Sequence, residues 1–98
     1  MSKEIYYTVC YFEGDKRVFV KLGEGGYPYV SKEGTPFSYY NVYRTEDDAK
    51  VAINVINKFF RESFPVLILE KWEVWVVDDV DTGKVKINTT HTRIKVYK

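Results

Sequence analysis

The chain of 98 residues is 45% apolar and 30% charged, which is the composition of one ordinary soluble domain spanning residues 1–98. Its formal net charge of +1 excludes a strong overall attraction to nucleic acids or membranes. One cysteine, Cys10, and one histidine, His91, are present, so an internal disulfide is excluded and a reducing, cytoplasmic setting is expected. The N-terminal residues start no long apolar stretch, so neither a signal peptide nor a membrane span is expected.

The N-terminal quarter of the chain predicts two antiparallel strands. Residues 4–13 are nearly all β-branched or aromatic, and both alternating faces are apolar, which is typical of a central strand. Residues 14–16 contain a glycine and predict a hairpin turn, after which 17–22 alternate as a returning strand. The glycine-rich residues 23–26 end that strand.

The next segment is aromatic but irregular. Pro28 and Pro36 lack the N–H group that a central strand must donate, so residues 27–36 predict a loop or an irregular edge. Residues 37–44 contain three tyrosines and predict a further extended segment.

One helix is predicted over residues 45–62. Thr45 has the side chain of a good N-cap, and Asp48, three residues later, resembles the acidic member of a capping box. Pro65 prevents the helix from continuing beyond residue 62 or 63. Apolar residues recur at helical spacing and define the face expected to be buried: Ala49, Ala52, Ile53, Ile56, Phe59 and Phe60.

The C-terminal third predicts a long hairpin, with a strand over 67–77, a turn over 78–83 and a returning strand over 84–97 that bulges or bends at 89–92. Taken together, the pattern predicts an α+β fold. Along the chain, two strands, a weaker third strand and a fourth strand precede the helix, and two more strands follow it. The helix is expected to pack on one face of an antiparallel sheet of about four to six strands.

Charge is distributed unevenly along this hairpin. Residues 84–98 contain five basic residues and no acid, whereas 70–81 contain five acids and one lysine. The first interpretation is that oppositely charged strands pair across the hairpin. The second is a basic face that binds nucleic acid through Lys84, Lys86, Arg93 and Lys95.

No motif carries a catalytic or metal-binding prediction. Residues 81–83, Asp-Thr-Gly, match the catalytic triplet of retroviral-type aspartic proteases, but the chain after them is too short for that fold and a hairpin turn explains them better. Asp79 and Asp81 have calcium-loop spacing without the glycine and glutamate that an EF-hand requires. His91 has no partner evident from the sequence, so no enzyme activity, cofactor or metal is expected.

Tyrosines are the residues most suggestive of binding. Five of the nine lie in or beside the irregular, proline-containing segments: Tyr27, Tyr29, Tyr39, Tyr40 and Tyr43. Tyrosine is favoured at interfaces because it offers a large contact area at a small entropy cost. These rings either form a contact surface for a partner or fill the open end of a small sheet.

The segment 39–49, YYNVYRTEDDA, leads an aromatic strand into a capped helix within a compact hairpin frame that lacks a catalytic set. In this respect the chain resembles the small accessory proteins of bacteriophages and other mobile elements, including anti-CRISPR and other anti-defence inhibitors. The resemblance implies a stoichiometric, non-enzymatic binder of a host protein. Many such inhibitors mimic DNA with heavy acidity, and this near-neutral chain departs from that pattern.

Two hypotheses for function follow. The first is a non-enzymatic intracellular inhibitor, a monomer or homodimer without membrane contact, that grips a host protein through the five tyrosines and the exposed sheet face. The second is a single-stranded nucleic-acid-binding protein that uses stacking tyrosines beside the basic C-terminal strands.

Overall fold

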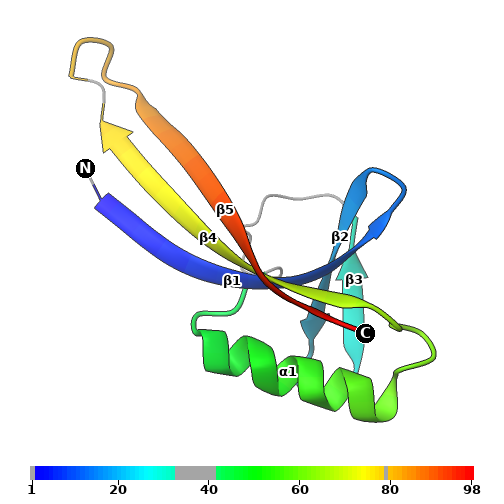
Figure 1. The fold of residues 1–98 in the computed structure, drawn as a ribbon. Coiled ribbons are helices and arrows are strands. Elements are labelled where there is room, and N and C mark those ends of the chain that lie inside the picture. Colours follow the sequence, from blue (N-terminus) through cyan, green and yellow to red (C-terminus); the bar gives the residue numbers. More distant parts are fainter. Residues whose placement is uncertain (1, 33–41, 79) are drawn as a thin grey trace.

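The computed structural model describes residues 2–32, 42–78 and 80–98. Its elements follow in the order β1 (Ser2–Glu13), β2 (Lys16–Leu22), β3 (Pro28–Ser31), α1 (Glu46–Phe59), β4 (Leu67–Asp78) and β5 (Val85–Tyr97). The strands form one antiparallel sheet in the order β3-β2-β1-β4-β5, and α1 covers one of its faces (Figure 1). The predicted α+β fold with a single helix on an antiparallel sheet is confirmed.

The core lies between α1 and the strands below it. Val9 and Val20 from the first hairpin meet Leu69 from β4 and Ile53 and Ile56 from α1, and all five are 0% exposed. A smaller cluster packs on the opposite face of the sheet: Cys10, Phe19, Ile68 and Trp72. Because both faces of β1 are apolar, this strand takes the central position that its sequence predicts.

The helix begins as predicted and ends sooner than predicted. The Thr45 hydroxyl accepts a hydrogen bond from the Asp48 N–H at 3.1 Å, which confirms the N-cap. The last helical residue is Phe59 instead of a residue near 62, because Phe60 leaves helical geometry and its carbonyl accepts the N–H groups of Ser63 and Phe64.

Two details of the strands refine the predictions. Pro28 is the first residue of the four-residue edge strand β3, where its missing N–H is tolerated. The prediction of a bulge or bend at 89–92 is wrong, because these residues pair regularly with β4. The register shifts later in the strand, where Glu70 pairs with Arg93 but Leu69 pairs with Lys95. The extra residue of the bulge is therefore Ile94.

The far ends of β4 and β5, with the start of β1 beside them, project away from α1 as an arm (Figure 1). The molecule accordingly measures 52 × 28 × 24 Å along its principal axes. No helix in the described parts of the chain is long and apolar enough to span a membrane.

Candidate functional site

The structure separates the tyrosines that were predicted to form one contact surface. Tyr27 is 71% exposed and Tyr29 is 40% exposed, whereas Tyr43 is only 6% exposed. Tyr39 and Tyr40 lie outside the described residues. Of the five predicted contact residues, Tyr27 and Tyr29 therefore remain as surface rings, and Tyr43 is a core residue.

Tyr27 is presented by a hydrogen-bonded turn between β2 and β3. The Gly23 N–H donates to the Tyr27 carbonyl at 2.9 Å, and the Gly26 N–H donates to the Gly23 carbonyl at 3.0 Å. A Cβ atom at position 23 would lie 3.3 Å from the Tyr27 carbonyl oxygen and 3.3 Å from the Tyr29 ring, which favours glycine there. The Tyr27 ring then meets the Phe60 ring edge-on, with centroids 5.9 Å apart.

The end of α1 carries a further exposed ring on Phe59, the residue that precedes Phe60. Phe59 is 67% exposed, which corrects the expectation that it belongs to the buried face of the helix. The reason is that the helix ends at this residue, so Phe60, not Phe59, packs against the core. Tyr27, Phe59 and Phe60 together are called the aromatic patch below. A surface hollow of about 320 Å³ lies over residues 58–63.

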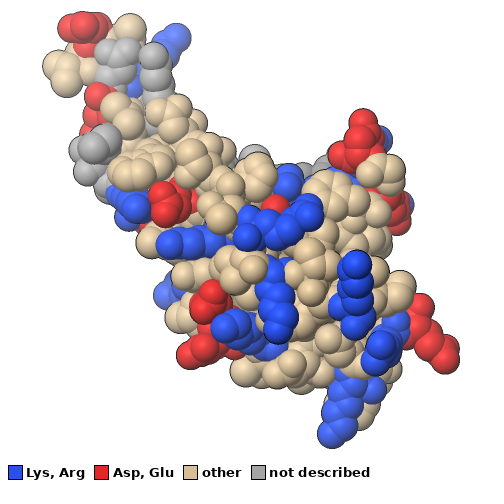
Figure 2. All heavy atoms as spheres, in the orientation of Figure 1, with Lys and Arg blue, Asp and Glu red and all other residues tan. Residues whose placement is uncertain are grey.

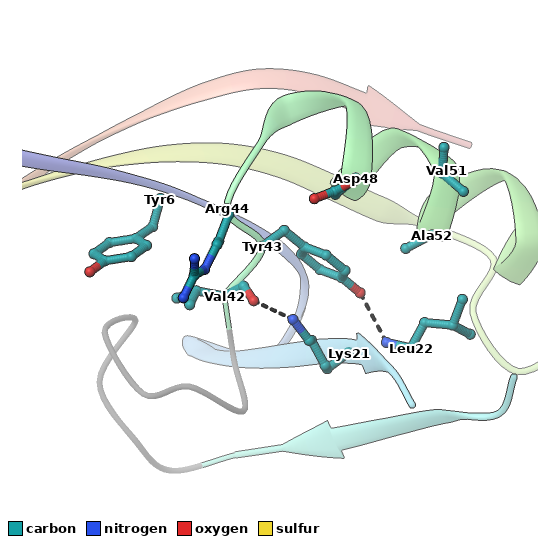
Figure 3. A pocket seen from close by; sticks show the side chains of 9 residues that line it. All are labelled: Tyr6, Lys21, Leu22, Val42, Tyr43, Arg44, Asp48, Val51 and Ala52. Carbon is teal, nitrogen blue, oxygen red and sulfur yellow. Dashed lines mark hydrogen bonds between the residues drawn. The ribbon is translucent and has the colours of Figure 1, made fainter. Parts of the chain in front are cut away.

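Tyr43 instead fills the gap that opens where β2 separates from β1. Its backbone forms a bridge with Tyr7, and its hydroxyl accepts a hydrogen bond from the Leu22 N–H at 2.9 Å (Figure 3). The Lys21 Nζ lies 4.2 Å from the ring centroid and donates to the Val42 carbonyl. Burial raises the pKa of Tyr43 to about 12, so the hydroxyl stays protonated at neutral pH.

A groove of about 480 Å³ lies beside Tyr43, at the start of α1 (Figure 3). Its wall carries Lys21, Arg44 and Asp48. Burial lowers the pKa of Lys21, while the negative charge of Asp48 acts in the opposite direction. Lys21 already holds the Val42 carbonyl, so its ammonium group has a structural role here.

A polar cluster lies on the sheet face that α1 does not cover. The Glu70 carboxylate is buried and accepts two hydrogen bonds from Arg17, from Nε at 2.8 Å and from Nη2 at 3.1 Å. The Cys10 Sγ donates to the same carboxylate at 3.0 Å. Burial, and then the hydrogen bond to Glu70, raise the pKa of Cys10 to about 12. The thiol is therefore protonated at neutral pH and is a poor nucleophile.

His91 has partners in this cluster that the sequence did not reveal. Its ring stacks on Trp72 with centroids 4.6 Å apart, and its Nε2 lies 3.4 Å from Arg17 Nη2. The Arg17 guanidinium also lies 5.3 Å from the Trp72 ring centroid. Trp72 in turn donates from Nε1 to the Thr8 hydroxyl at 2.8 Å. These contacts organise a packed polar layer on the sheet.

The predicted basic residues are not brought onto one face. Arg93 pairs with Glu70, on the uncovered face, whereas Lys95 pairs with Leu69, whose side chain lies in the core beneath α1. Cross-strand partners share a face, so Arg93 and Lys95 point to opposite sides. Lys84 precedes β5, and the side chain of Lys86 lies outside what the structure describes.

The acidic and basic strands β4 and β5 do pair, as predicted. The cations that pair with Glu70 and Glu73 of β4, however, do not come from β5. Glu70 is held by Arg17 of β2, and Glu73 lies 3.5 Å from Lys3 of β1 and 3.7 Å from Lys71. Figure 2 shows basic side chains across the middle of one face and acidic side chains mostly at the projecting ends.

No protein-family model, curated protein or solved structure matches this chain in the comparisons with known proteins. Among residues 2–32, 42–78 and 80–98, no three His, Cys, Asp or Glu side chains gather as a metal site would require. The aromatic patch and the basic strand β5 are therefore the features on which a function can be argued.

Proposed function

We propose that the protein is a non-enzymatic binding protein whose aromatic patch docks onto a host protein. We further propose that it acts as an inhibitor, in the manner of the small anti-defence proteins of mobile elements that it resembles. The observation that carries the proposal is that aromatic rings are highly exposed while one of them, Tyr27, is held in place by its neighbours. Tyr27 is 71% exposed and Phe59 is 67% exposed, yet Tyr27 is held by the Gly23 turn and by Phe60.

This combination suits an interface for a physical reason. A partner that covers these rings removes apolar surface from water, which contributes roughly 25 cal/mol for each Å². Because the turn already holds Tyr27, little conformational entropy is lost when the partner binds. Exposed aromatic rings are also the side chains that most often dominate the energy of protein interfaces.

The chemistry of the polar cluster supports a binding role over a catalytic one. The Cys10 thiol has a pKa of about 12, and the Glu70 carboxylate is buried against Arg17. Both groups are engaged in holding the sheet together. Nucleic-acid binding is the second candidate, favoured by His91 stacked on Trp72 near Arg17. It ranks lower because Trp72 is 6% exposed and offers little ring surface to a base.

The test is affinity capture from a bacterial lysate, with and without nuclease, using three forms of the protein. The wild type is expected to retain a stoichiometric protein partner after nuclease treatment. Changing Tyr27→Ala and Phe59→Ala together should abolish capture, because each buried anchor contributes about 1–3 kcal/mol. Val51→Ala with Val80→Ala is the matched control, since these side chains are 60% and 94% exposed and lie outside the patch.

The control variant should retain the partner. A partner that the Tyr27→Ala, Phe59→Ala variant still captures would contradict the aromatic patch as the docking site. Loss of capture from the wild type after nuclease treatment would favour the nucleic-acid alternative.

A further inference from the structure

Among the strands that the structure describes, β5 is a long sheet edge with no strand on its outer side. It spans 13 residues and is last in the strand order, whereas the opposite edge, β3, has only four residues. Every strand at an edge presents a row of backbone N–H and C=O groups that lack a neighbouring strand. A short edge such as β3 offers few of them, and a long edge such as β5 offers a template for another strand.

The backbone of β5 is regular and extended over most of its length, as pairing with another strand requires. Residues 85–93 pair with β4 in continuous register, and the bulge comes after them, at Ile94. The strand contains no proline. It is instead rich in β-branched residues, which favour extended backbone: Val85, Ile87, Thr89, Thr90, Thr92, Ile94 and Val96.

The positive charge of the β5 edge favours an acidic partner. Residues 84–98 contain five basic residues and no acid. In the neighbouring strand β4, Glu70 pairs with Arg17, and Glu73 pairs with Lys3 and Lys71, so neither acid pairs with a cation of β5. Within the part of the chain that the structure describes, Lys84, Arg93 and Lys95 take part in no ion pair. The edge therefore combines free backbone groups with uncompensated positive charge.

We propose that β5 binds an extended, acidic segment of a partner protein as a sixth strand of the sheet. Backbone hydrogen bonds to the edge would hold the segment, and its carboxylates would compensate Lys84, Arg93 and Lys95. A second copy of the chain fits less well, because pairing two β5 edges would bring basic residues against basic residues. A nucleic acid would meet the charges but would leave the alternating N–H and C=O groups unpaired.

This proposal uses residues other than those of the aromatic patch. The start of β5 lies toward the tip of the arm, away from α1, whereas Arg93 and Lys95 lie in the half of β5 that returns toward α1 (Figure 1). The inference therefore does not rest on the proposed function, and either can fail alone.

The test uses the full protein and a nine-residue peptide that carries glutamates on both faces of an extended strand, because Arg93 and Lys95 point to opposite faces, with valine or threonine at its other positions. Titration followed by NMR is expected to shift the backbone amide signals of β5, with smaller changes at β3 and at the end of α1. The same peptide with lysine in place of glutamate is the charge control and should not bind. Raising the salt concentration should weaken the binding of the glutamate peptide, because salt screens the interaction between the charges.

Two N-methylated versions of the acidic peptide test backbone pairing on the unaltered protein. N-methyl groups on alternate residues block the N–H groups of one strand edge. One version should lose binding, and the version methylated on the other edge should retain it. Equal binding of both, equal binding of the lysine peptide, or dimerisation through β5 that excludes the acidic peptide would overturn the proposal.

Protein variants then locate the charge. Arg93→Glu with Lys95→Glu should lower the affinity for the acidic peptide about tenfold or more, which corresponds to about 1.4 kcal/mol of binding free energy. Lys16→Glu with Lys50→Glu changes the total charge by the same amount at the start of β2 and on α1, so binding should change less than about twofold. Equal weakening by both pairs would show an effect of total charge alone and would also overturn the proposal. A stronger interaction with a single-stranded oligonucleotide than with the peptide would do the same.

Discussion

The helix-covered half of the sheet and the arm are built from the same strands, but they are stabilised differently. Beneath α1, Val9, Val20 and Leu69 are 0% exposed and pack against the helix. On the arm, Val85 is 59% exposed and Ile87 is 57% exposed, although both lie in a continuous ladder with β4. Side-chain burial thus holds the covered half, and backbone pairing holds the arm. A surface held mainly by its ladder can carry exposed side chains for binding at little cost in stability.

The same contrast governs the ion pairs. Arg17 and Glu70 form a two-bond contact in which the glutamate side chain is 2% exposed, whereas Lys3 and Glu73 on the arm are 39% and 30% exposed. Solvent therefore screens the Lys3–Glu73 pair more strongly than the Arg17–Glu70 pair. The Arg17–Glu70 pair is thus expected to contribute to the stability of the fold, whereas the Lys3–Glu73 pair is expected to contribute little.

The largest expected effect compares isoleucines in the two regions. Ile53→Ala should lower the free energy of unfolding by about 2–5 kcal/mol, because Ile53 is 0% exposed and the change leaves a cavity under α1. Ile87→Ala should cost about 1 kcal/mol or less, since that side chain is 57% exposed. Urea unfolding measures both. Equal losses would mean that the arm contributes a core of its own.

Removing one cation from each ion pair gives the next effect. Arg17→Met should cost about 2–3 kcal/mol in urea unfolding, because the buried Glu70 carboxylate loses its partner. Lys3→Met should cost about 0.5 kcal/mol, since the Lys3–Glu73 pair is exposed to solvent. Adding Glu70→Gln to Arg17→Met removes the uncompensated charge and should recover part of the loss. A double variant less stable than Arg17→Met alone would contradict this explanation.

These contacts show where sequence reasoning reached its limit. The Thr45 cap, the central position of β1 and the long β4–β5 hairpin follow from local patterns, because residues 3 or 4 apart on a helix and 2 apart on a strand decide them. The contact of Arg17 with Glu70 and the stacking of His91 on Trp72 depend on which strands become neighbours. Local patterns do not contain that information.

The candidate surfaces illustrate the same limit. The sequence left open whether Tyr27 is a contact ring or fills the end of the sheet, and the structure shows that it is exposed. Tyr43 could not be assigned, because its burial depends on the gap that β2 leaves when it separates from β1. Phe59 was missed because its exposure depends on where the helix ends, which spacing alone leaves uncertain by a few residues. The position of the bulge at Ile94 likewise separates Arg93 from Lys95.

Alkaline pH should lower the free energy of unfolding through Cys10 and Tyr43. The pKa of Cys10 is raised from its ordinary value of 9.0 to about 12, mainly by burial, and that of Tyr43 from 10.0 to about 12 for the same reason. The unfolded chain therefore releases these protons first as pH rises. Their contribution is complete below pH 9 and is lost between about pH 9 and pH 12.

The measurement is the free energy of unfolding in urea at several values between pH 8 and pH 11. It should fall with rising pH, and Tyr43→Phe should make the fall shallower above pH 10 because one titrating group is gone. Tyr27→Phe is the matched control, since it removes a tyrosine hydroxyl from a ring that is 71% exposed. Identical slopes for wild type and Tyr43→Phe would contradict the role of this hydroxyl.

The smallest effect tests whether the first turn of α1 belongs to the covered half alone. Thr45→Ala removes the hydroxyl that accepts the Asp48 N–H at 3.1 Å and should cost about 1 kcal/mol. Thr45→Ser keeps an accepting hydroxyl and should cost much less. Hydrogen exchange locates the change, because losing a cap frays the adjacent turn before it affects distant strands. Amides at the start of α1 should exchange faster in Thr45→Ala, while those of β4 and β5 on the arm should keep their relative protection. Faster exchange on the arm beyond the global loss of stability would mean that α1 and the arm unfold as one unit.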